Sequence, residues 1–320
     1  MTLKSLIQSG LPVIPGALLK DYTTFRLGGP CQALIICSQA SEVIKAASVL
    51  RQLNCKFLVM GFGSNILASD QGVDCILIRY SSDTPLITRE GQLLTVDAAT
   101  QLDQLVLFSL QQGLPGLEKF SGIPGTVGGG IAGNAGAYGQ QISDRLVSLQ
   151  ILARDNSVQK INRNDIFFSY RDSSLKRDGT IILSATFELS PEEDTTKLLA
   201  DRTALLISRE EKHGRWQDNP CAGSFFRNIL PSSKAGKRES AGWFLEQAGC
   251  KDLNIGGAHC LHTHANIITR DIGASARDVY ELTQTMTAMV KEKFNLQLER
   301  EVRLLGQFDN AAGRNQEGFW

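Results

Sequence analysis

The sequence predicts an α+β fold with more than one domain. Its 320 residues are too many for one compact core and suit two or three domains. Short β-like runs alternate with helical patterns up to about residue 112, strand-rich sequence follows from 145 to about 189, and helices with short strands fill the last third. With 42% hydrophobic and 21% charged residues, the chain can bury a sizeable interior.

The N-terminal part reads as an α/β segment. Apolar runs at 33–36, 57–60 and 75–78 predict buried strands, and the amphipathic pattern over 41–53 predicts a helix. We expect these elements to form a first unit over residues 1–80.

A second unit is expected over residues 81–194. Its predicted elements are a strand at 93–98, a helix at 102–112 that ends at Gly113, and strands at 146–152 and 180–188. The polar stretch 191–194 indicates the boundary that follows.

A third unit is expected over residues 195–308. Helical patterns cover 195–211, 240–248 and 274–294, a loop covers 212–220, and strands are predicted at 265–268 and 298–304. The remaining residues, 309–320, are polar and predict a disordered tail.

Charge and cysteine usage exclude several classes of protein. Lys plus Arg and Asp plus Glu balance at 33 each, so nothing favours nucleic acid or an anionic membrane as a partner. No apolar run approaches the ~18–20 residues of a membrane helix, and residues 1–10 are too polar for a signal peptide. The seven cysteines are scattered without a C-x-x-C, which favours reduced thiols. We expect a cytoplasmic monomer.

Glycine is concentrated in SGIPGTVGGGIAGNAGAYG (121–139), where eight of the 18 residues from Gly122 to Gly139 are glycine. Glycine allows positive φ and close approach to a ligand, and successive N–H groups in such a loop can hold phosphate. The loop is not a P-loop, and no strand directly precedes it as a Rossmann turn requires.

A second glycine turn, GFGSN (61–65), follows the strand predicted at 57–60. Two such loops indicate a long ligand with a central pyrophosphate, and flavin adenine dinucleotide (FAD) fits.

Several motifs together carry a family resemblance. Besides the two glycine loops they are TFRLGG (24–29), FSYRDS (168–173), AGSFFRN (222–228), AGWFLEQAG (241–249), HAN (264–266) and LEREVR (298–303). In this order they resemble the UDP-N-acetylenolpyruvoylglucosamine reductase family, in its compact form without an extra insertion. The ordered set spans nearly the whole chain, so it is far more specific than any single motif.

The resemblance implies a fold and a reaction. The fold would be a two-part FAD-binding region of the vanillyl-alcohol-oxidase/PCMH type, followed by a C-terminal α+β substrate domain. The reaction would be NADPH-dependent, FAD-mediated reduction of UDP-N-acetylglucosamine enolpyruvate to UDP-N-acetylmuramate, a peptidoglycan precursor. All four histidines lie at 213 or beyond, so a histidine-linked flavin has no candidate in residues 1–200 and FAD is expected to be non-covalent.

The resemblance also assigns binding residues. The cofactor-binding residues it implies are Gly61, Gly63, Ser64, Asn65, Ser121, Gly122, Pro124, Gly125, Thr126, Gly128, Gly129, Asn134, Gly136 and Ala137. Tyr170 and Asn228 are the implied substrate-binding residues. The chain departs from the family at Phe62, where a third glycine is frequent, and at Lys212, where Lys-Gln-Pro is replaced by Lys-His-Gly.

Three side chains are predicted to be catalytic. Arg171 follows the aromatic-rich stretch 167–170, so its stem is expected to pack and its guanidinium to stabilise an enolate. Ser224 lacks the glycines of a nucleophile elbow, and the resemblance implies a general acid instead. Of Glu299 and Glu301, which would share one face of a strand, the resemblance selects Glu301, the residue before the valine.

Other interpretations remain open on the sequence. His259, His262 and His264 form H-x-x-H-x-H, and 262 and 264 would share a strand face, but no carboxylate or cysteine pair completes a site, so we expect no metal. A different FAD oxidoreductase of this fold, acting on a sugar or alcohol, is one rival. A non-catalytic nucleotide-sugar-binding protein is another, although it need not keep the three catalytic side chains together.

Overall fold

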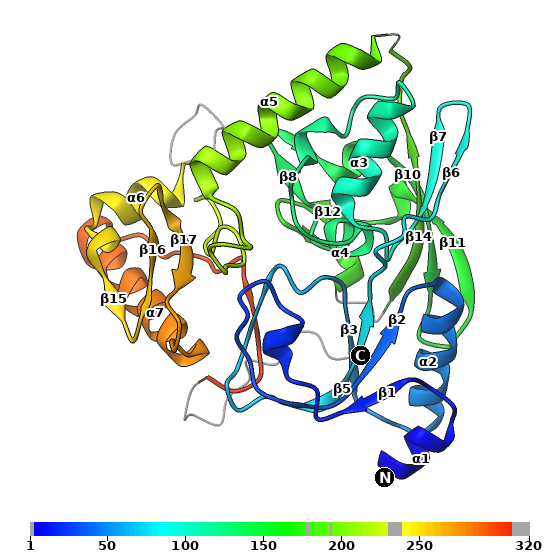
Figure 1. Cartoon of the computed structure of the whole chain (residues 1–320), viewed down its shortest axis with the longest axis horizontal. Coiled ribbons are helices and arrows are strands. Elements are labelled where there is room, and N and C mark those ends of the chain that lie inside the picture. The colour runs from blue at the N-terminus through cyan, green and yellow to red at the C-terminus, as the bar shows by residue number, and fades with distance from the viewer. Residues whose placement is uncertain (1–2, 177–179, 193, 230–238, 309–320) are drawn as a thin grey trace.

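The computed structural model describes residues 3–176, 180–192, 194–229 and 239–308. Three main sheets follow one another along the chain, and a helical C-terminal part stands to one side of the first two sheets (Figure 1). The predicted tail at 309–320 lies outside the described residues. The division into units 1–80, 81–194 and 195–308 stays a prediction.

The first sheet has the strand order β1-β2-β5-β3. Its strands are β1 (Val13–Pro15), β2 (Cys31–Cys37), β5 (Val73–Tyr80) and β3 (Phe57–Met60), and the last three run parallel. Helix α2 (Ala40–Gln52) packs its buried side chains on this sheet, and the short α1 (Leu3–Gln8) precedes β1. The Gln39–Glu42 capping box explains why α2 begins at 40.

The second sheet is antiparallel, with the order β11-β10-β14-β7-β6. Its strands are β6 (Ile87–Glu90), β7 (Leu93–Asp97), β10 (Leu146–Leu152), β11 (Val158–Asn162) and β14 (Ile181–Glu188). Helix α3 (Leu102–Gln111) ends before Gly113, whose φ of +67° suits glycine. A single buried core, which includes Ile35, Ile78 and Phe187, continues through both sheets.

The glycine-rich stretch contains a short helix where the sequence indicated only a loop. Thr126 caps α4 (Val127–Ala132) by accepting a hydrogen bond from the Gly129 N–H at 3.2 Å. A Cβ on Gly128 would lie 3.0 Å from the Ala98 Cβ, so glycine lets this helix approach the end of β7. Two small hairpins follow: β8 (Gly136–Ala137) with β9 (Gln140–Gln141), and β12 (Phe168–Ser169) with β13 (Asp172–Ser173).

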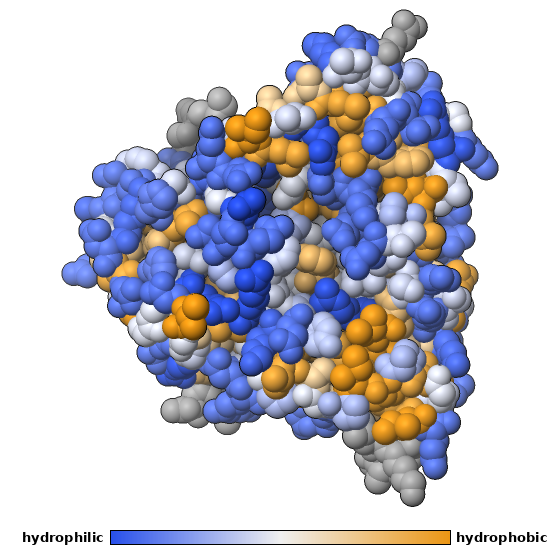
Figure 2. Space-filling view, in the orientation of Figure 1, coloured by the Kyte–Doolittle hydropathy of each residue, from blue (hydrophilic) through white to orange (hydrophobic). Residues whose placement is uncertain are grey.

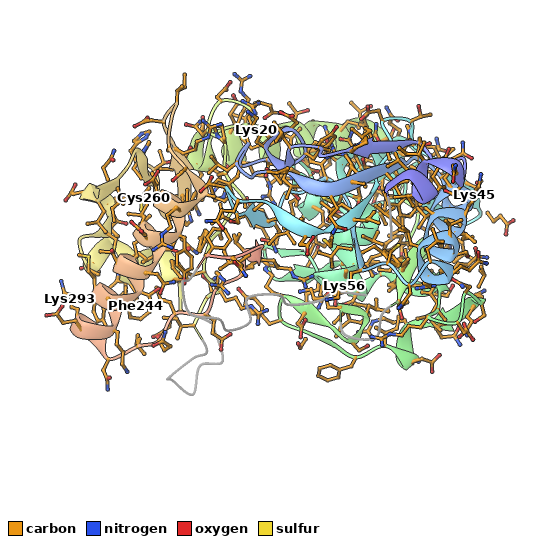
Figure 3. The ribbon with its side chains drawn as sticks, turned by 90° about the horizontal axis from the view of Figure 1, so that it is seen from below. Lys20, Lys45, Lys56, Phe244, Cys260 and Lys293 are labelled. Atoms are coloured by element: carbon orange, nitrogen blue, oxygen red, sulfur yellow. The ribbon has the colours of Figure 1, made fainter. Side chains whose placement is uncertain are left out.

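The C-terminal part has its own sheet and core. Strands β15 (Asn254–Ile255), β16 (Ala258–Leu261) and β17 (His264–Arg270) pack with α6 (Ala241–Gln247) and α7 (Ala276–Phe294). Figure 3 shows Phe244, Cys260 and Lys293 in this part and Lys45 at the far end of the molecule. Ser275 caps α7, which is why this helix begins at 276 and not at the predicted 274.

Two elements join the C-terminal part to the rest. Helix α5 (Thr195–His213) packs against the second unit, where Arg202 pairs with Asp103 at 2.6 Å. Strand β18 (Arg303–Leu305) returns to pair in parallel with β4 (Ile66–Ala68), directly after the GFGSN turn. Of the predicted 298–304 strand, only Arg303 and Leu304 belong to this ladder, and residue 300 makes an isolated bridge with Phe226 instead.

Candidate active site

The two glycine loops, more than 50 residues apart in sequence, touch each other in the fold. A Cβ on Gly61 would collide with the Thr126 Oγ1, and the Ser64 hydroxyl donates to the Pro124 carbonyl at 2.7 Å. Gly63 has φ of +73°, and a Cβ there would collide with the Tyr22 carbonyl oxygen. Glycine is therefore favoured at 61 by close approach of the Thr126 side chain, and at 63 by both conformation and close backbone approach.

The first glycine turn offers unbonded backbone donors. Within the described residues, none of the N–H groups from 61 to 65 donates a hydrogen bond to a protein acceptor. The N–H groups of residues 127–130, by contrast, all bond to protein acceptors at 2.8–3.2 Å. Because unbonded N–H groups in a partly buried turn are available to a ligand, we take the 61–65 turn as the candidate anion cradle, beside the predicted 121–139 loop.

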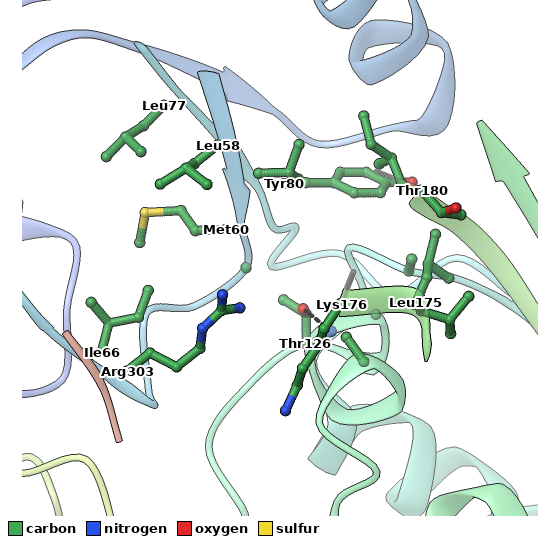
Figure 4. A pocket seen from close by; sticks show the side chains of 18 of the residues that line it. Leu58, Met60, Ile66, Leu77, Tyr80, Thr126, Leu175, Lys176, Thr180 and Arg303 are labelled. Carbon is green, nitrogen blue, oxygen red and sulfur yellow. Dashed lines mark hydrogen bonds between the residues drawn. The ribbon is translucent and has the colours of Figure 1, made fainter. Parts of the chain in front are cut away.

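A cavity extends from these loops between the first two sheets (Figure 4). It is lined by residues of β3, β5, α4, β14 and β18, and four of the predicted cofactor-binding residues border it: Gly61, Thr126, Gly128 and Gly129. Most other lining side chains are apolar, including Leu58, Met60, Ile66 and Leu77. Figure 4 shows Arg303 and Lys176 reaching toward the space from opposite sides. An apolar cleft with two cations and an amide cradle fits a dinucleotide with planar rings and a pyrophosphate.

Other predicted cofactor-binding residues make hydrogen bonds that hold the 121–139 loop in place. The Ser121 hydroxyl donates to the Glu118 carbonyl at 2.7 Å, and the Gly122 N–H donates to Asp103 at 2.7 Å. The Asn134 amide donates to Gln141 and to the Ser169 carbonyl, which ties the glycine loop to β12.

Gly136 and Ala137 form β8, and a Cβ on Gly136 would lie 2.6 Å from the Arg171 Nη1. Gly125, at φ +144°, has the Ser64 Oγ as its nearest neighbour. Asn65 donates from its side-chain amide to the Glu301 carbonyl at 3.2 Å and accepts the Arg303 N–H at 3.0 Å through its own carbonyl. Asn65 thus links the anion cradle to the segment that carries Glu301.

Arg171 and Glu301 form an ion pair beside Lys176, which lines the cavity. The Arg171 Nε lies 3.0 Å from the Glu301 Oε1, although 130 residues separate them in sequence. The Arg171 guanidinium also lies 5.3 Å from the centre of the Tyr170 ring, so its stem packs on an aromatic residue as predicted. Phe167 is 65% exposed and takes no part in this packing.

The backbone of Arg171 is strained. Tyr170 and Arg171 form the two-residue turn between β12 and β13, and Arg171 has φ of +59°, a value that is costly for a side chain with a Cβ. The Lys176 Nζ holds this turn by donating to the Arg171 carbonyl at 3.0 Å, and it lies 3.5 Å from Asp172. The turn directs the guanidinium toward Glu301.

Burial raises the pKa of Glu301 above its ordinary value, while Arg171 and Arg227 oppose the rise. Its neighbour Glu299 is different: the Glu299 side chain is 71% exposed and lies 3.6 Å from Arg227, whereas the Glu301 side chain is 20% exposed. The expectation that both would share one face of a strand is wrong, because residues 299–301 are not part of a ladder strand.

Ser224 lies in a segment held from both sides. The Phe225 N–H donates to the Asn266 carbonyl and the Phe225 carbonyl accepts the Glu301 N–H, both at 2.8 Å. The Asn266 side chain clamps Phe226 by accepting its N–H at 2.9 Å and donating to its carbonyl at 2.8 Å. The Ser224 hydroxyl is half-buried and has no hydrogen-bond partner in the described residues, so it can donate to a ligand.

The predicted substrate residues also meet at this site. The Asn228 N–H donates to the Tyr170 hydroxyl at 3.4 Å, and the Asn228 side chain accepts the Ala241 N–H at 3.2 Å. The structure therefore brings together Tyr170, Arg171, Asn228 and Glu301. Lys212 and His213 are the last two residues of α5, and neither borders the cavity.

Sequence reasoning missed three residues of this site: Lys176, Arg303 and Asn266. Lys176 lies five residues after Arg171 and Arg303 two residues after Glu301, so proximity to the catalytic motifs was the available signal. Asn266 stood in the HAN motif, but its clamp on Phe226 depends on a contact across 40 residues, which no local pattern indicates.

The histidine pattern has a structural explanation. His262 lies in the turn between β16 and β17, so the expectation that it shares a strand face with His264 is wrong. The His264 ring packs 5.3 Å from the His213 ring, and its Nδ1 accepts the Asn266 N–H at 3.2 Å.

Among the described residues no three His, Cys, Asp or Glu side chains gather as metal ligands. No helix in the described ranges is both long and apolar enough to span a bilayer.

This combination defines a class of protein. A dinucleotide-sized cavity with an amide cradle, next to an arginine–glutamate pair and an available hydroxyl, is the arrangement of a flavin-dependent oxidoreductase with a separate substrate domain. Residues 31–162 match the family described as FAD binding domain. Residues 215–305 match the C-terminal domain of UDP-N-acetylenolpyruvoylglucosamine reductase.

Whole-chain similarity is specific. The UDP-N-acetylenolpyruvoylglucosamine reductase of Bacillus subtilis is 34% identical over 296 residues, 92% of this chain and 94% of that protein. That of Trichormus variabilis is 34% identical over 92% of this chain and 87% of its own. The reductase structure from Thermus caldophilus superposes with a TM-score of 0.75 at 29% identity, covering 92% of this chain and 99% of that one. The chain belongs to the UDP-N-acetylenolpyruvoylglucosamine reductase family, as the sequence motifs predicted.

Proposed function

We propose that this protein reduces the enolpyruvyl ether of UDP-N-acetylglucosamine to UDP-N-acetylmuramate, with NADPH as electron donor and FAD as cofactor, in peptidoglycan precursor synthesis. The observation that carries the proposal is the Arg171–Glu301 pair, held beside Lys176 and Arg303 of the cavity that the glycine loops border. The nearby hydroxyl of Ser224 completes the set of groups that such a reduction needs.

The residues present fit FAD. The unbonded N–H groups of the 61–65 turn would hold the pyrophosphate, and the apolar walls between β3, β5 and β14 would hold the ring systems. Lys176 and Arg303 would add positive charge along the same cavity. When bound and reduced by NADPH, FAD supplies the hydride for C3 of the enolpyruvyl group.

The protein's own groups then manage charge and protons. Hydride addition at C3 leaves negative charge on C2 and the substrate carboxylate. Arg171 would stabilise that charge as a fixed cation, and protonated Glu301 would donate a hydrogen bond to it. Ser224 would deliver a proton to C2 as the general acid. Tyr170 and Asn228 would position the substrate across the junction of the two parts.

Cellular context is also part of the proposal. None of the seven cysteines, six of them buried, forms a disulfide, which supports a cytoplasmic location. The balanced charge supports action without nucleic acid, and we propose that the protein acts as a monomer divided at about residues 80 and 194.

An anaerobic titration tests the function. The purified protein should be yellow, NADPH should bleach it, and the enolpyruvyl nucleotide should restore the colour. UDP-N-acetylglucosamine, which lacks the enolpyruvyl group, is the matched control and should leave the reduced flavin unchanged. Bleaching of the oxidised protein by a sugar or alcohol would instead indicate the rival oxidoreductase, and a colourless protein would contradict the proposal.

A further inference from the structure

A second cavity of about 450 Å³ lies at the junction of the two parts of the molecule. Its walls come from the N-terminal segment 20–26, from Phe62 and Arg79 of the first unit, and from Trp216 and Arg270 of the C-terminal part. Lys20, one of its lining residues, is labelled between the two parts in Figure 3. None of its lining residues is among those that line the cavity between the first two sheets, and none is a proposed catalytic or substrate-binding residue, although Phe62 belongs to the 61–65 turn.

The cavity is strongly basic. Lys20, Arg26, Arg79 and Arg270 line it, and Asp21 is the single carboxylate among the lining residues. In the described part of the chain, none of the four cations lies within 4.0 Å of a carboxylate oxygen. Figure 2 shows strongly hydrophilic side chains gathered at the centre of the visible face, between the two parts of the molecule.

Aromatic rings and backbone carbonyls hold two of the arginines in place. Arg79 donates to the Tyr22 carbonyl at 3.0 Å and to the Ser81 hydroxyl at 3.1 Å, and its guanidinium lies 5.3 Å from the Tyr22 ring centre and 5.6 Å from that of Phe62. Arg26 lies 5.8 Å from the Trp216 ring centre. These rings restrict the guanidiniums before any ligand arrives, which lowers the entropy cost of binding.

The third arginine crosses the junction. Arg270 donates to the carbonyls of Phe25 and Arg26 at 3.3 and 3.2 Å, which brings two guanidinium-bearing residues side by side. Burial lowers the pKa of Arg270, and repulsion from Arg26 lowers it further. Burial also lowers the pKa of Arg79. Positive charge is therefore concentrated here without a matching anion from the described protein, an arrangement that a bound anion would stabilise.

We infer that this cavity binds a phosphorylated small molecule of about the size of a nucleoside diphosphate. Guanidinium groups match phosphate oxygens in a bidentate geometry, and several cations around one space favour a polyanion over a single carboxylate. The volume lies within the roughly 300–1,000 Å³ range of small-molecule sites. The site is additional to the proposed reaction, because none of its residues is in the proposed catalytic set and only Phe62, in the 61–65 turn, is shared with the groups proposed to hold FAD.

Isothermal titration calorimetry on the FAD-loaded, oxidised full chain tests this inference without using turnover. The probes are ADP, pyrophosphate and inorganic phosphate, each added with and without saturating enolpyruvyl nucleotide. We expect ADP to bind more tightly than inorganic phosphate, with an affinity that falls as salt rises and is unchanged by the enolpyruvyl nucleotide. Pyrophosphate binding as tightly as ADP would identify the phosphates as the recognised group.

Variants locate the site. Arg26→Gln and Arg270→Gln should each weaken ADP binding about tenfold or more, because each removes a charge-assisted contact. Arg215→Gln is the matched control. Arg215 lies next to Trp216 but pairs with Glu210 and Asp218 outside the cavity, so this variant should bind ADP with the affinity of the original chain. If Arg270→Gln fails to fold, Lys20→Gln at an exposed position carries the same test.

Three results would overturn the inference. They are no heat from any probe at millimolar concentration, equal affinity in the Arg26 and Arg215 variants, or loss of ADP binding when the enolpyruvyl nucleotide is present. The last result would place ADP in the substrate site. Because the calorimetry needs no reaction, failure of the proposed activity would not produce any of these outcomes by itself.

Discussion

Glu299 and Glu301 are chemically identical and two residues apart, yet only one belongs to the site. The Glu301 N–H bonds to the Phe225 carbonyl, which turns its side chain inward to Arg171, while Glu299 stays in solvent near Arg227. A carboxyl group acquires a functional role here through burial and one ion pair. Residue type alone does not distinguish the two positions.

Ser224→Ala should separate the two half-reactions. The hydroxyl is proposed to act only when C2 is protonated, so bleaching of the flavin by NADPH should stay near normal. Reoxidation by the enolpyruvyl nucleotide should slow by about 10²–10⁴-fold, as for loss of a general acid. Stopped-flow absorbance of the flavin measures both rates. An equal loss in both half-reactions would show that Ser224 has a structural role only.

Glu301 should give the substrate half-reaction its pH dependence. Burial raises the pKa of Glu301, so the protonated form persists to higher pH than for an ordinary glutamate and is lost as pH rises through that pKa. Reoxidation of the reduced flavin should therefore slow with rising pH in the original protein. Glu301→Gln should remain appreciably active without that dependence, since the amide still donates a hydrogen bond.

The matched controls are Glu301→Ala and Glu299→Ala. Glu301→Ala should lose several orders of magnitude in reoxidation while flavin reduction stays intact, and Glu299→Ala should remain near the original rate. Similar effects at 299 and 301, or a pH profile unchanged in Glu301→Gln, would contradict the assignment.

At the scale of elements, the site depends on how helices and strands end. Helix α5 ends at His213, whose ring meets His264 at the start of β17, and the His264 Nδ1 accepts the Asn266 N–H. Asn266 in turn holds the segment that carries Ser224. The contact between α5 and β17 thus helps to hold the segment that carries Ser224 in place.

This histidine pair should make stability depend on pH. Burial, together with the charges of His264, Lys212 and Arg209, lowers the pKa of His213 to about 4, and burial lowers that of His264. In the unfolded chain these histidines take up protons near pH 6.5, whereas in the folded chain they do so only at lower pH. The free energy of unfolding should therefore be highest above pH 6.5 and should fall as pH drops toward 4.

Urea unfolding at pH 7 and pH 5 measures the effect. His213→Leu should lose less stability between these pH values than the original chain does. His262→Leu, at an exposed turn position, is the control and should lose as much as the original chain. An unchanged difference in His213→Leu would rule out His213 as the source.

At the scale of the whole molecule, three distant segments surround one cavity. Strand β18 pairs with β4 beside the anion cradle, and the first two sheets share one core on the other side of the cavity. FAD bound there would contact both sheets and β18 at once. Because a ligand that binds only the folded chain stabilises it, cofactor removal should weaken the whole assembly.

Removal of FAD should therefore lower the Tm, and re-addition should restore it. At a free FAD concentration of 100 times its Kd, the expected stabilisation is about 2.7 kcal/mol. Differential scanning calorimetry of the yellow protein and its colourless form measures this. Acid precipitation should leave all the yellow colour in the supernatant. Colour retained in the pellet would contradict non-covalent binding, and equal Tm values would place the flavin outside the cavity.

Local pattern predicted most elements of the fold. The strand at 57–60 and the strand at 146–152 were placed without error, and α2 and α3 within one residue, because their apolar periodicity is strong and their ends carry capping or glycine signals. The helix inside the glycine-rich stretch and the irregular path at 298–302 escaped prediction. In both places tertiary contacts, with Ala98 and with Phe226, outweigh local propensity.

By itself, the sequence determined the family and the cofactor class, because both follow from the order of its motifs and the positions of its glycines, and it nominated the catalytic side chains that we propose. Only the tertiary structure decided that the N–H groups of 61–65 have no protein acceptor among the described residues, that Arg171 meets Glu301, and that four cations line a second cavity. The physical reason is distance along the chain. Hydrogen bonding, burial and ion pairing between segments tens or hundreds of residues apart depend on how the sheets pack, and periodicity and spacing report only local geometry.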